Sequence, residues 1–226
     1  MACCRPTGWN VLRVCKPECQ IFIKSAFTNA RIRQKQPLRP ATTMITGTKP
    51  LDPTMLQTLC RPMTDSDLPA VLALQAQVYP ADILEEEAFF LNRLALAAWT
   101  CRVTIREERL LGYLVAYPWS ADLPPALNQP LERLPQQADS WFVHDCAVSP
   151  QAQGLGLASL MLRDSALSAG QAGLTRASLV SLAPAVGYWE KQGYRPVPHT
   201  PALVAKLAGY GPGASYMTRE LDGSGQ

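Results

Sequence analysis

The sequence predicts one mixed α/β domain over residues 55–222. The chain has 226 residues, of which 47% are hydrophobic and 17% charged, and its mean hydropathy is −0.03. This composition is typical of a folded, soluble protein. From Met55 onward, short apolar runs of strand type alternate irregularly with stretches of helical periodicity. The resulting order, β α α β β β α β α β β, contains no internal repeat and indicates a single domain.

The first half of the domain is predicted to hold two helices between strands. A strand is expected at Leu56–Met63, and the polar residues 64–67 are expected to cap a helix that ends at Tyr79-Pro80. A second helix is expected to begin near Asp82. Its first turn carries Glu85–Glu87, and its apolar face would hold Leu84, Ala88, Leu91 and Leu94.

The next elements are predicted as a hairpin and an insert. Strands at Trp99–Ile105 and Leu110–Tyr117 flank four charged residues, which favours a hairpin. Residues 118–140 are irregular and contain five prolines, and a long loop of this kind inside a compact domain is more often functional than not. The remaining elements are expected as a strand at Trp141–Val148, a helix at Leu155–Ala169, a strand at Arg176–Leu182, a helix at Pro184–Gln192, and strands at Tyr194–Val197 and Ala214–Leu221.

Charge is divided between an N-terminal extension and the domain. Residues 1–54 hold nine Lys/Arg against two acidic residues, a net charge of +7, whereas the rest holds 12 basic and 16 acidic residues, a net charge of −4. An acidic domain argues against nucleic-acid binding, and no apolar run reaches the roughly 18 residues of a membrane span. We expect residues 1–54 to be a disordered or poorly ordered basic extension, with a transit peptide and a start at Met44 or Met55 as alternatives. Residues 223–226 form a short tail.

The cysteines indicate neither a metal site nor disulfides. Cys3, Cys4, Cys15 and Cys19 lie in the extension without the paired spacing of structural zinc sites. The other three, Cys60, Cys101 and Cys146, are scattered and odd in number, which favours thiols in a reducing compartment. We therefore expect a cytoplasmic protein without a bound metal.

The segment from Val148 to Ala158 is the most informative part of the sequence. A strand ends, a polar turn contains Gly154 and Gly156, and an apolar helix begins. Such a turn directs unpaired backbone N–H groups and the positive end of a helix toward one point, which suits a phosphate. The Gly-Lys-Ser/Thr of a P-loop and the third glycine of a dinucleotide site are absent. A plain strand–turn–helix with glycines for packing is the alternative.

Two motifs in order resemble those of a known family. Gln151-x-x-Gly154-x-Gly156 is similar to the acetyl-CoA loop of the GCN5-related N-acetyltransferases (GNAT), and the run Tyr188-Trp189-Glu190-Lys191-Gln192-Gly193-Tyr194 is similar to the family's second motif. Tyr79-Pro80, the run 124–128 and the run 143–148 resemble, more narrowly, bacterial relatives of serotonin (arylalkylamine) N-acetyltransferase. The resemblance extends over about residues 55–222.

The resemblance implies a fold and a cofactor site. The fold would be a central, mixed but mostly antiparallel sheet, splayed between its fourth and fifth strands, with helices on both faces. Acetyl-CoA would lie in the splay as co-substrate, with no metal. The residues implied in binding it are Cys146, Ala147, Val148, Gln151, Gln153, Gly154, Leu155, Gly156, Leu157, Ala158 and Trp189.

His144 is the candidate general base, because an imidazole takes up protons in the range that an attacking amine requires. Strand alternation would place Phe142, His144 and Cys146 on one face and Asp145 on the other. The serotonin enzyme's pattern has a second histidine where Phe142 stands, and a buried core histidine is the alternative reading of His144. Trp189 occupies the family's usual position for an acidic Tyr, and an indole N–H is too weak an acid for this role. Tyr188 is the candidate general acid, with Ser181, water or unassisted departure of the thiolate as alternatives.

The acceptor site is expected to combine aromatic and acidic side chains. Its candidates are Tyr79, Tyr117, Trp119 and Asn128, together with Glu85–Glu87. The expected activity is acetyl transfer to the primary amine of a small molecule by direct attack, in a monomer or homodimer. A protein or peptide N-acetyltransferase of the same fold would need an open groove in place of residues 118–140, and a non-catalytic acyl-CoA-binding protein is the other alternative.

Overall fold

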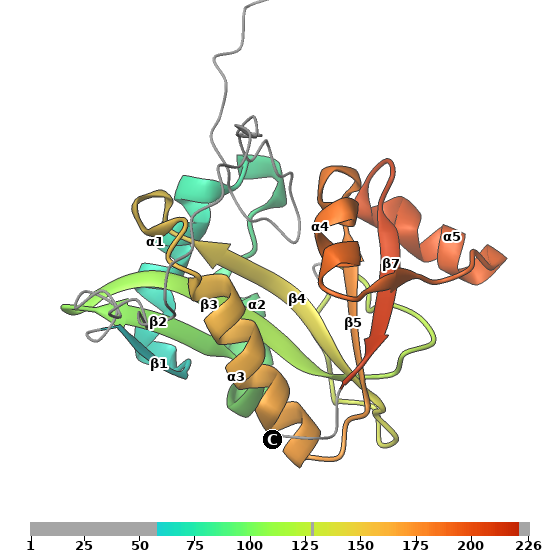
Figure 1. Cartoon of the computed structure of the whole chain (residues 1–226), viewed down its shortest axis with the longest axis horizontal. Helices are drawn as coiled ribbons and strands as arrows, with labels where there is room; N and C mark the ends of the chain where they lie inside the picture. The colour runs from blue at the N-terminus through green and yellow to red at the C-terminus, as the bar shows by residue number, and fades with distance from the viewer. Residues whose placement is uncertain (1–57, 128, 222–226) are drawn as a thin grey trace, which may run out of the picture.

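The computed structural model describes residues 58–127 and 129–221 (Figure 1). The strands are β1 (Leu59–Pro62), β2 (Arg102–Arg106), β3 (Arg109–Trp119), β4 (Ser140–Val148), β5 (Arg176–Ser181), β6 (Arg195–Pro196) and β7 (Ser215–Glu220). The α-helices are α1 (Leu68–Val78), α2 (Glu87–Ala97), α3 (Leu157–Gln171), α4 (Val186–Lys191) and α5 (Pro201–Leu207). Within these residues no helix combines the length and apolar character that a membrane span needs. The predicted single α/β domain is confirmed.

One seven-stranded sheet carries the fold, in the order β1-β2-β3-β4-β5-β7-β6. Only β4 and β5 run parallel; the other neighbours are antiparallel. Leu68 and Val71 of α1, Phe90 of α2 and Leu203 of α5 belong to one buried cluster. The residues Met161 of α3 and Trp189 of α4 belong to a second cluster. Helices therefore cover both faces, as predicted.

The sheet opens between β4 and β5. Their pairing joins Ser140–Val143 to Arg176–Leu179 and does not continue, whereas β5 stays paired to β7 through Ser181. Figure 1 shows the two strands diverging beyond this point. The expected splay is thus present, and among the described residues the second half of β4 has a strand partner only in β3.

A β-bulge in β4 corrects the predicted faces of that strand. Val115 of β3 lies opposite Asp145, and the next residue, Ala116, lies opposite Val143, so His144 is an extra residue in β4. A bulge of this kind reverses the alternation beyond it. Asp145 therefore lies on the same face as His144, and Cys146 lies on the opposite face, contrary to the expectation from strict alternation.

The helix boundaries differ from the prediction at three places. Residues 81–83 form a 3₁₀ turn and Leu84 is extended, so α2 begins at Glu87 rather than near Asp82. This shift turns Leu91 outward, with 41% of its surface exposed, and buries Phe90 instead. Helix α3 begins at Leu157, after the glycines. Helix α5 was not predicted, although Thr200 caps it by accepting the Leu203 N–H at 3.2 Å.

Candidate functional site

The glycine turn after β4 forms an open cradle. Gly154 and Gly156 have φ angles of +78° and +73°, a region that residues with a side chain rarely adopt. A Cβ atom on either glycine would meet no other part of residues 58–127 and 129–221 within 4 Å, so these residues leave the space beside both glycines open. Gly156 is the N-cap of the 15-residue helix α3, and no side chain caps that end. The first amides of α3 are thus directed at the space that the glycines leave open.

The polar residues of the turn support this shape. Ser149 donates its backbone N–H to the Leu111 carbonyl at 2.7 Å, which ties the turn to the beginning of β3. Its hydroxyl donates to the side-chain carbonyl of Gln151. The Gln153 amide nitrogen is buried and has no hydrogen-bond partner among the described residues. Of the predicted loop residues, Gln151, Gly154 and Gly156 are exposed, whereas Ala152, Leu157 and Ala158 are buried.

Tyr188 and Cys146 lie on the face of β4 that α3 and α4 cover. Burial, and next the nearby Cys146, raise the pKa of the Tyr188 hydroxyl, whereas Ser159 lowers it. Trp189 is 1% exposed, and its ring packs edge-on against Tyr188 at 5.0 Å. Its indole N–H has no acceptor among the described residues. Tyr188 therefore supplies a hydroxyl from α4 on the same side of β4 as Cys146.

His144 lies on the other face of β4 and is held at both ring nitrogens. Its Nε2 lies 2.8 Å from Oε1 of Glu85, and its Nδ1 lies 3.2 Å from the Tyr117 hydroxyl. The Phe89 ring lies 4.7 Å from the imidazole, tilted by 34°. Burial raises the pKa of Tyr117 well above its usual value, so this hydroxyl keeps its proton. The sequence placed Glu85 and Tyr117 among substrate contacts, and the structure joins both to the imidazole.

A buried carboxylate lies beside this group. Asp145 is fully buried and accepts hydrogen bonds from Tyr113, at 2.7 Å, and from Tyr79. Burial, with Asp145 next in size, raises the pKa of both tyrosines. Tyr79, a predicted substrate contact, therefore joins α1 to β4. The sequence carried no signal for this cluster, because it depends on the bulge at His144.

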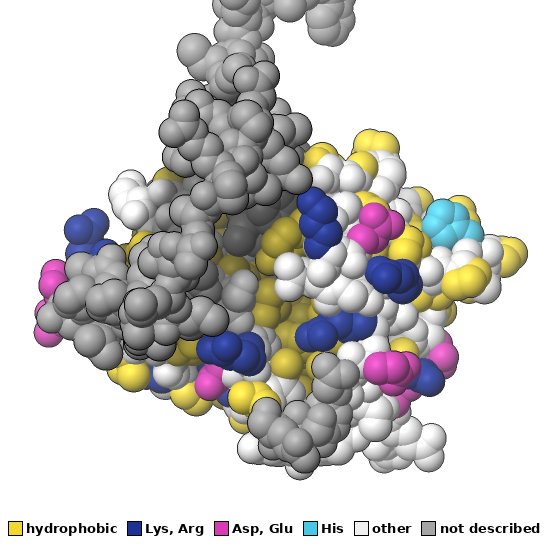
Figure 2. All heavy atoms as spheres, viewed as in Figure 1, with side chains coloured by type: hydrophobic (Ala, Val, Ile, Leu, Met, Phe, Trp, Pro, Cys, Tyr) yellow, Lys and Arg dark blue, Asp and Glu magenta, His cyan; other side chains and the backbone are white. Residues whose placement is uncertain are grey.

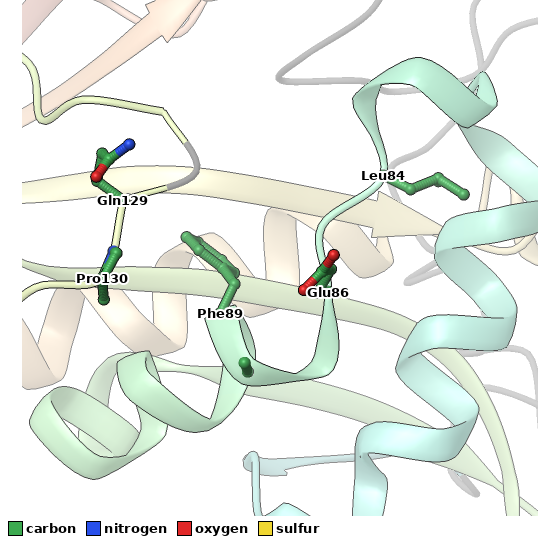
Figure 3. A pocket seen from close by; sticks show the side chains of 6 residues that line it. Leu84, Glu86, Phe89, Gln129 and Pro130 are labelled. Atoms are coloured by element: carbon green, nitrogen blue, oxygen red, sulfur yellow. The ribbon is translucent and has the colours of Figure 1, made fainter.

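A cavity of about 370 Å³ opens beside the Phe89 ring. Figure 3 shows Phe89 and Glu86 at the start of α2 facing Gln129 and Pro130 of the insert. Leu84 and Ala88 complete the lining. Because Phe89 also contacts the His144 ring, the cavity lies one aromatic ring away from the candidate base. Of the lining residues, only Glu86 was predicted to contact the acceptor. Asn128, the predicted contact next to Gln129, lies outside the described residues.

The insert is attached to the body on both sides. The Asn92 side chain donates to the Leu131 carbonyl and accepts from its N–H, both at 2.9 Å. Arg93 donates to the Gln129 carbonyl at 2.9 Å. Farther along, Tyr210 donates to the Pro125 carbonyl at 2.7 Å, and Trp119 donates to Leu123 at 2.9 Å. The wall of the cavity is therefore a fixed part of the fold.

We expect Asn92→Ala to loosen this wall. Removing both hydrogen bonds to Leu131 leaves two backbone groups without partners, so the free energy of unfolding should fall by about 1–3 kcal/mol, and proteases should cut the insert faster. Urea denaturation and limited proteolysis measure the two effects. Ser120→Ala, which removes only two exposed hydrogen bonds to Asp122 in the same insert, should change neither. Equal behaviour of the two variants would contradict this attachment.

The described cysteines are free thiols. Cys101 and Cys146 are buried and Cys60 is half-buried; burial raises the pKa of Cys101 to about 11. Over residues 58–127 and 129–221, no cluster of three His, Cys, Asp or Glu side chains is arranged to hold a metal ion. The four N-terminal cysteines lie outside these residues.

One face of the molecule combines the opening with basic side chains. Figure 2 shows hydrophobic side chains exposed in the middle of this face, beside the α4 and β7 region. Several Lys and Arg side chains stand around them. Such a surface suits a ligand with an apolar arm and negatively charged groups.

Comparison with known proteins gives a consistent result. The model of the Acetyltransferase (GNAT) family matches residues 68–194, more than half of the chain. No curated protein sequence matches the chain. The narrower relationship to serotonin N-acetyltransferase therefore stays a resemblance.

Solved structures resemble this fold at low sequence identity. The loading GNATL domain of CurA from Lyngbya majuscula has a TM-score of 0.61 at 11% identity, covering 73% of this chain and 98% of its own. The N-acetylglutamate synthase of Neisseria gonorrhoeae, solved with coenzyme A and N-acetyl-glutamate, has a TM-score of 0.57 at 17% identity, covering 73% of this chain and 35% of its own. Arabidopsis thaliana Naa50, solved with a CoA–peptide bisubstrate analogue, has a TM-score of 0.51 at 11% identity, covering 72% and 98%. These similarities concern the fold.

Proposed function

Because this chain belongs to the GNAT acetyltransferase family, we propose that it transfers the acetyl group of acetyl-CoA to the primary amine of a small molecule. The observation that carries the choice of a small molecule is the cavity beside Phe89, which the attached insert walls off. A protein-acetylating enzyme needs space for an extended peptide chain. Here Gln129 and Pro130 of the insert form part of the cavity lining, where such a chain would have to pass.

The glycine turn fits the pyrophosphate of coenzyme A. The space beyond Gly154 and Gly156 is open, and the end of α3 presents amides without a side-chain cap. Backbone N–H groups at a helix N-terminus are favourable partners for phosphate oxygens. We place Gln153 to Ala158 around the pyrophosphate. Cys146, Ala147 and Val148 then line the pantetheine arm along the unpaired part of β4.

Two candidate proton-transfer groups lie on opposite faces of β4. His144 lies on the cavity side, where it would take up the proton that the amine loses on attack. The Tyr188 hydroxyl lies on the side of α3 and α4, near Cys146, where it would protonate the leaving thiolate. Its raised pKa keeps it protonated at neutral pH, as an acid requires. Acetyl-CoA supplies the activated acyl group, and these residues supply and accept protons.

The cavity suggests the type of amine. Leu84, Ala88, Phe89 and Pro130 provide an apolar lining, and the Glu86 carboxylate adds a negative charge. A protonated amine on an apolar skeleton matches this combination, because it gains from burial and from the carboxylate. Tyr117 and Trp119, the other predicted acceptor contacts, pack edge to face with their rings 6.1 Å apart and do not line this cavity.

We expect the protein to release thiol from acetyl-CoA with small primary amines and not with peptides. The measurement compares arylalkylamines, polyamines and N-terminal peptides at equal concentration, with acetyl-CoA alone as the control for hydrolysis. Faster turnover with peptides would favour a peptide acetyltransferase of the same fold. Acetyl-CoA binding without turnover by any amine would indicate a non-catalytic acyl-CoA-binding protein.

A further inference from the structure

Glu85 is the only carboxylate that the structure brings into contact with His144 among the described residues. The side chains of both residues are at most 1% exposed, and their atoms lie 2.8 Å apart. Two neighbouring acids of the same run, Glu86 and Glu87, point elsewhere: the first lines the cavity and the second begins α2. The pair therefore arises from the local path of the chain and not from a general excess of acid.

The backbone of Glu85 is held from both sides by one side chain. Its N–H donates to Oε1 of Gln75, and its carbonyl accepts from Nε2 of Gln75, each at 2.9 Å. Gln75 lies on α1 and is 2% exposed. This double hydrogen bond fixes the segment between α1 and α2 at the residue whose carboxylate reaches the imidazole. Functional histidines commonly keep one orientation because the residue that they contact is itself held by further hydrogen bonds.

The contacts define which ring nitrogen is basic. With Glu85 ionised, its carboxylate accepts hydrogen bonds and donates none, and Nε2 of His144 then carries the proton that Glu85 accepts. The other nitrogen, Nδ1, then holds the free electron pair and accepts a hydrogen bond from Tyr117. A proton taken up by the ring arrives at Nδ1, on the side of Tyr117, and the resulting positive charge lies next to Glu85.

We propose that Glu85 is a positioning residue for the candidate base: held by Gln75, it fixes the Nε2–H tautomer of His144 and balances the imidazolium that forms when Nδ1 takes up the proton of the amine. This step rests on the proposed function. In it, one N–H bond of the amine breaks and the Nδ1–H bond forms, either directly or by way of the Tyr117 hydroxyl, which would pass on its own proton and receive the amine's. No further reactant is needed.

The Glu85→Gln substitution removes one charge and leaves the other charged or titratable groups around His144 in the chain. They are the Tyr117 hydroxyl from β3, the Arg93 guanidinium from α2, which lies 5.1 Å from the Tyr117 ring, and Asp145 from β4. Asp145 accepts its hydrogen bonds from Tyr79 and Tyr113, whereas the imidazole is bonded to Glu85 and Tyr117. A change in the titration of His144 in a Glu85 variant therefore reports on Glu85.

The decisive experiment is ¹⁵N NMR of histidine-labelled protein over a pH series. The chain has two histidines, and His199, which is exposed, provides the internal reference. In the wild type, Nε2 of His144 should be protonated and Nδ1 should not. In Glu85→Gln the second proton should be taken up at a pH lower by about one unit or more, because an opposite charge has been removed. Protonated Nδ1 in the neutral wild type, or an unchanged titration, would overturn the inference.

Kinetics provide the second readout. In Glu85→Gln, kcat/KM should fall about 10- to 100-fold, as is common when the partner of a functional histidine is lost, and the acidic limb of its pH profile should move to lower pH. Glu85→Asp keeps the charge, so the acidic limb of its pH profile should lie within a few tenths of a pH unit of the wild-type limb. Glu107→Gln, at the exposed β2–β3 turn, should match the wild type. A uniform loss of rate with no movement of the limb would assign Glu85 a purely structural role.

The NMR series needs neither acetyl-CoA nor an amine. A wild type that shows the expected tautomer and titration but acetylates no amine would refute the proposed function and leave the Glu85–His144 pairing intact. Conversely, an active enzyme with the opposite tautomer would refute the positioning role alone.

Discussion

Gly154→Glu should abolish coenzyme A binding while leaving the protein folded. Gly154 has a φ of +78°, and the space beyond its Cα is open, so the new side chain projects into the region assigned to the pyrophosphate. There it adds a negative charge and blocks backbone amides. Losing two charge-assisted hydrogen bonds of about 1.5–3 kcal/mol each corresponds to a decrease in affinity of about 10²–10⁴-fold.

Calorimetry with coenzyme A measures this effect, and Gly173→Glu provides the control. Gly173 also has a positive φ, +86°, and open space beyond its Cα, but it follows the far end of α3. The two variants therefore carry similar backbone strain, and only the first introduces bulk and charge at the start of α3. Equal affinities in both variants would show that the cradle does not hold the pyrophosphate.

His144→Ala should lower turnover by about 10²–10⁴-fold, the usual contribution of a general base, with little change in coenzyme A affinity. The imidazole lies on the cavity face of β4, away from Cys146 and α3, so its loss does not alter the cradle. Because a base acts in its unprotonated form, the wild-type rate should rise as the imidazole loses its second proton. In the variant, the rate should rise only at higher pH, where the free amine loses its own proton.

Steady-state kinetics over a pH series and calorimetry separate these effects. His199→Ala, in the loop before α5, is the matched control and should behave as the wild type. Because the substitution leaves the buried Glu85 without the imidazole, His144→Gln, which keeps a polar side chain at this place, serves as a second variant. Wild-type turnover in either variant would remove His144 from the mechanism.

Local sequence patterns predicted most of the fold and the cradle. The glycine turn is encoded within a few residues, since positive φ angles and an uncapped helix end need only Gly154, Gly156 and the apolar run after them. The strands carry alternating or continuous apolar runs, and the sheet's opening followed from the family resemblance. These features depend little on distant parts of the chain.

The contacts of the candidate base could not be predicted in the same way. Its bulge has no local signature, because every residue of β4 is buried and burial on both faces does not reveal which residue is extra. The pairing of His144 with Glu85 spans 59 residues and depends on where α2 begins. The predicted start near Asp82 placed all three glutamates in one helical turn, whereas the observed start at Glu87 leaves Glu85 extended and directed inward.

The short parallel pairing of β4 with β5 creates a sheet edge in the interior of the fold. Exposed sheet edges invite pairing with other chains and promote aggregation. Here residues of α3 and α4 share a buried cluster with Cys146 and Val148 of this edge. The short pairing thus leaves a hydrogen-bonding template between two strands of one sheet, flanked by its own helices.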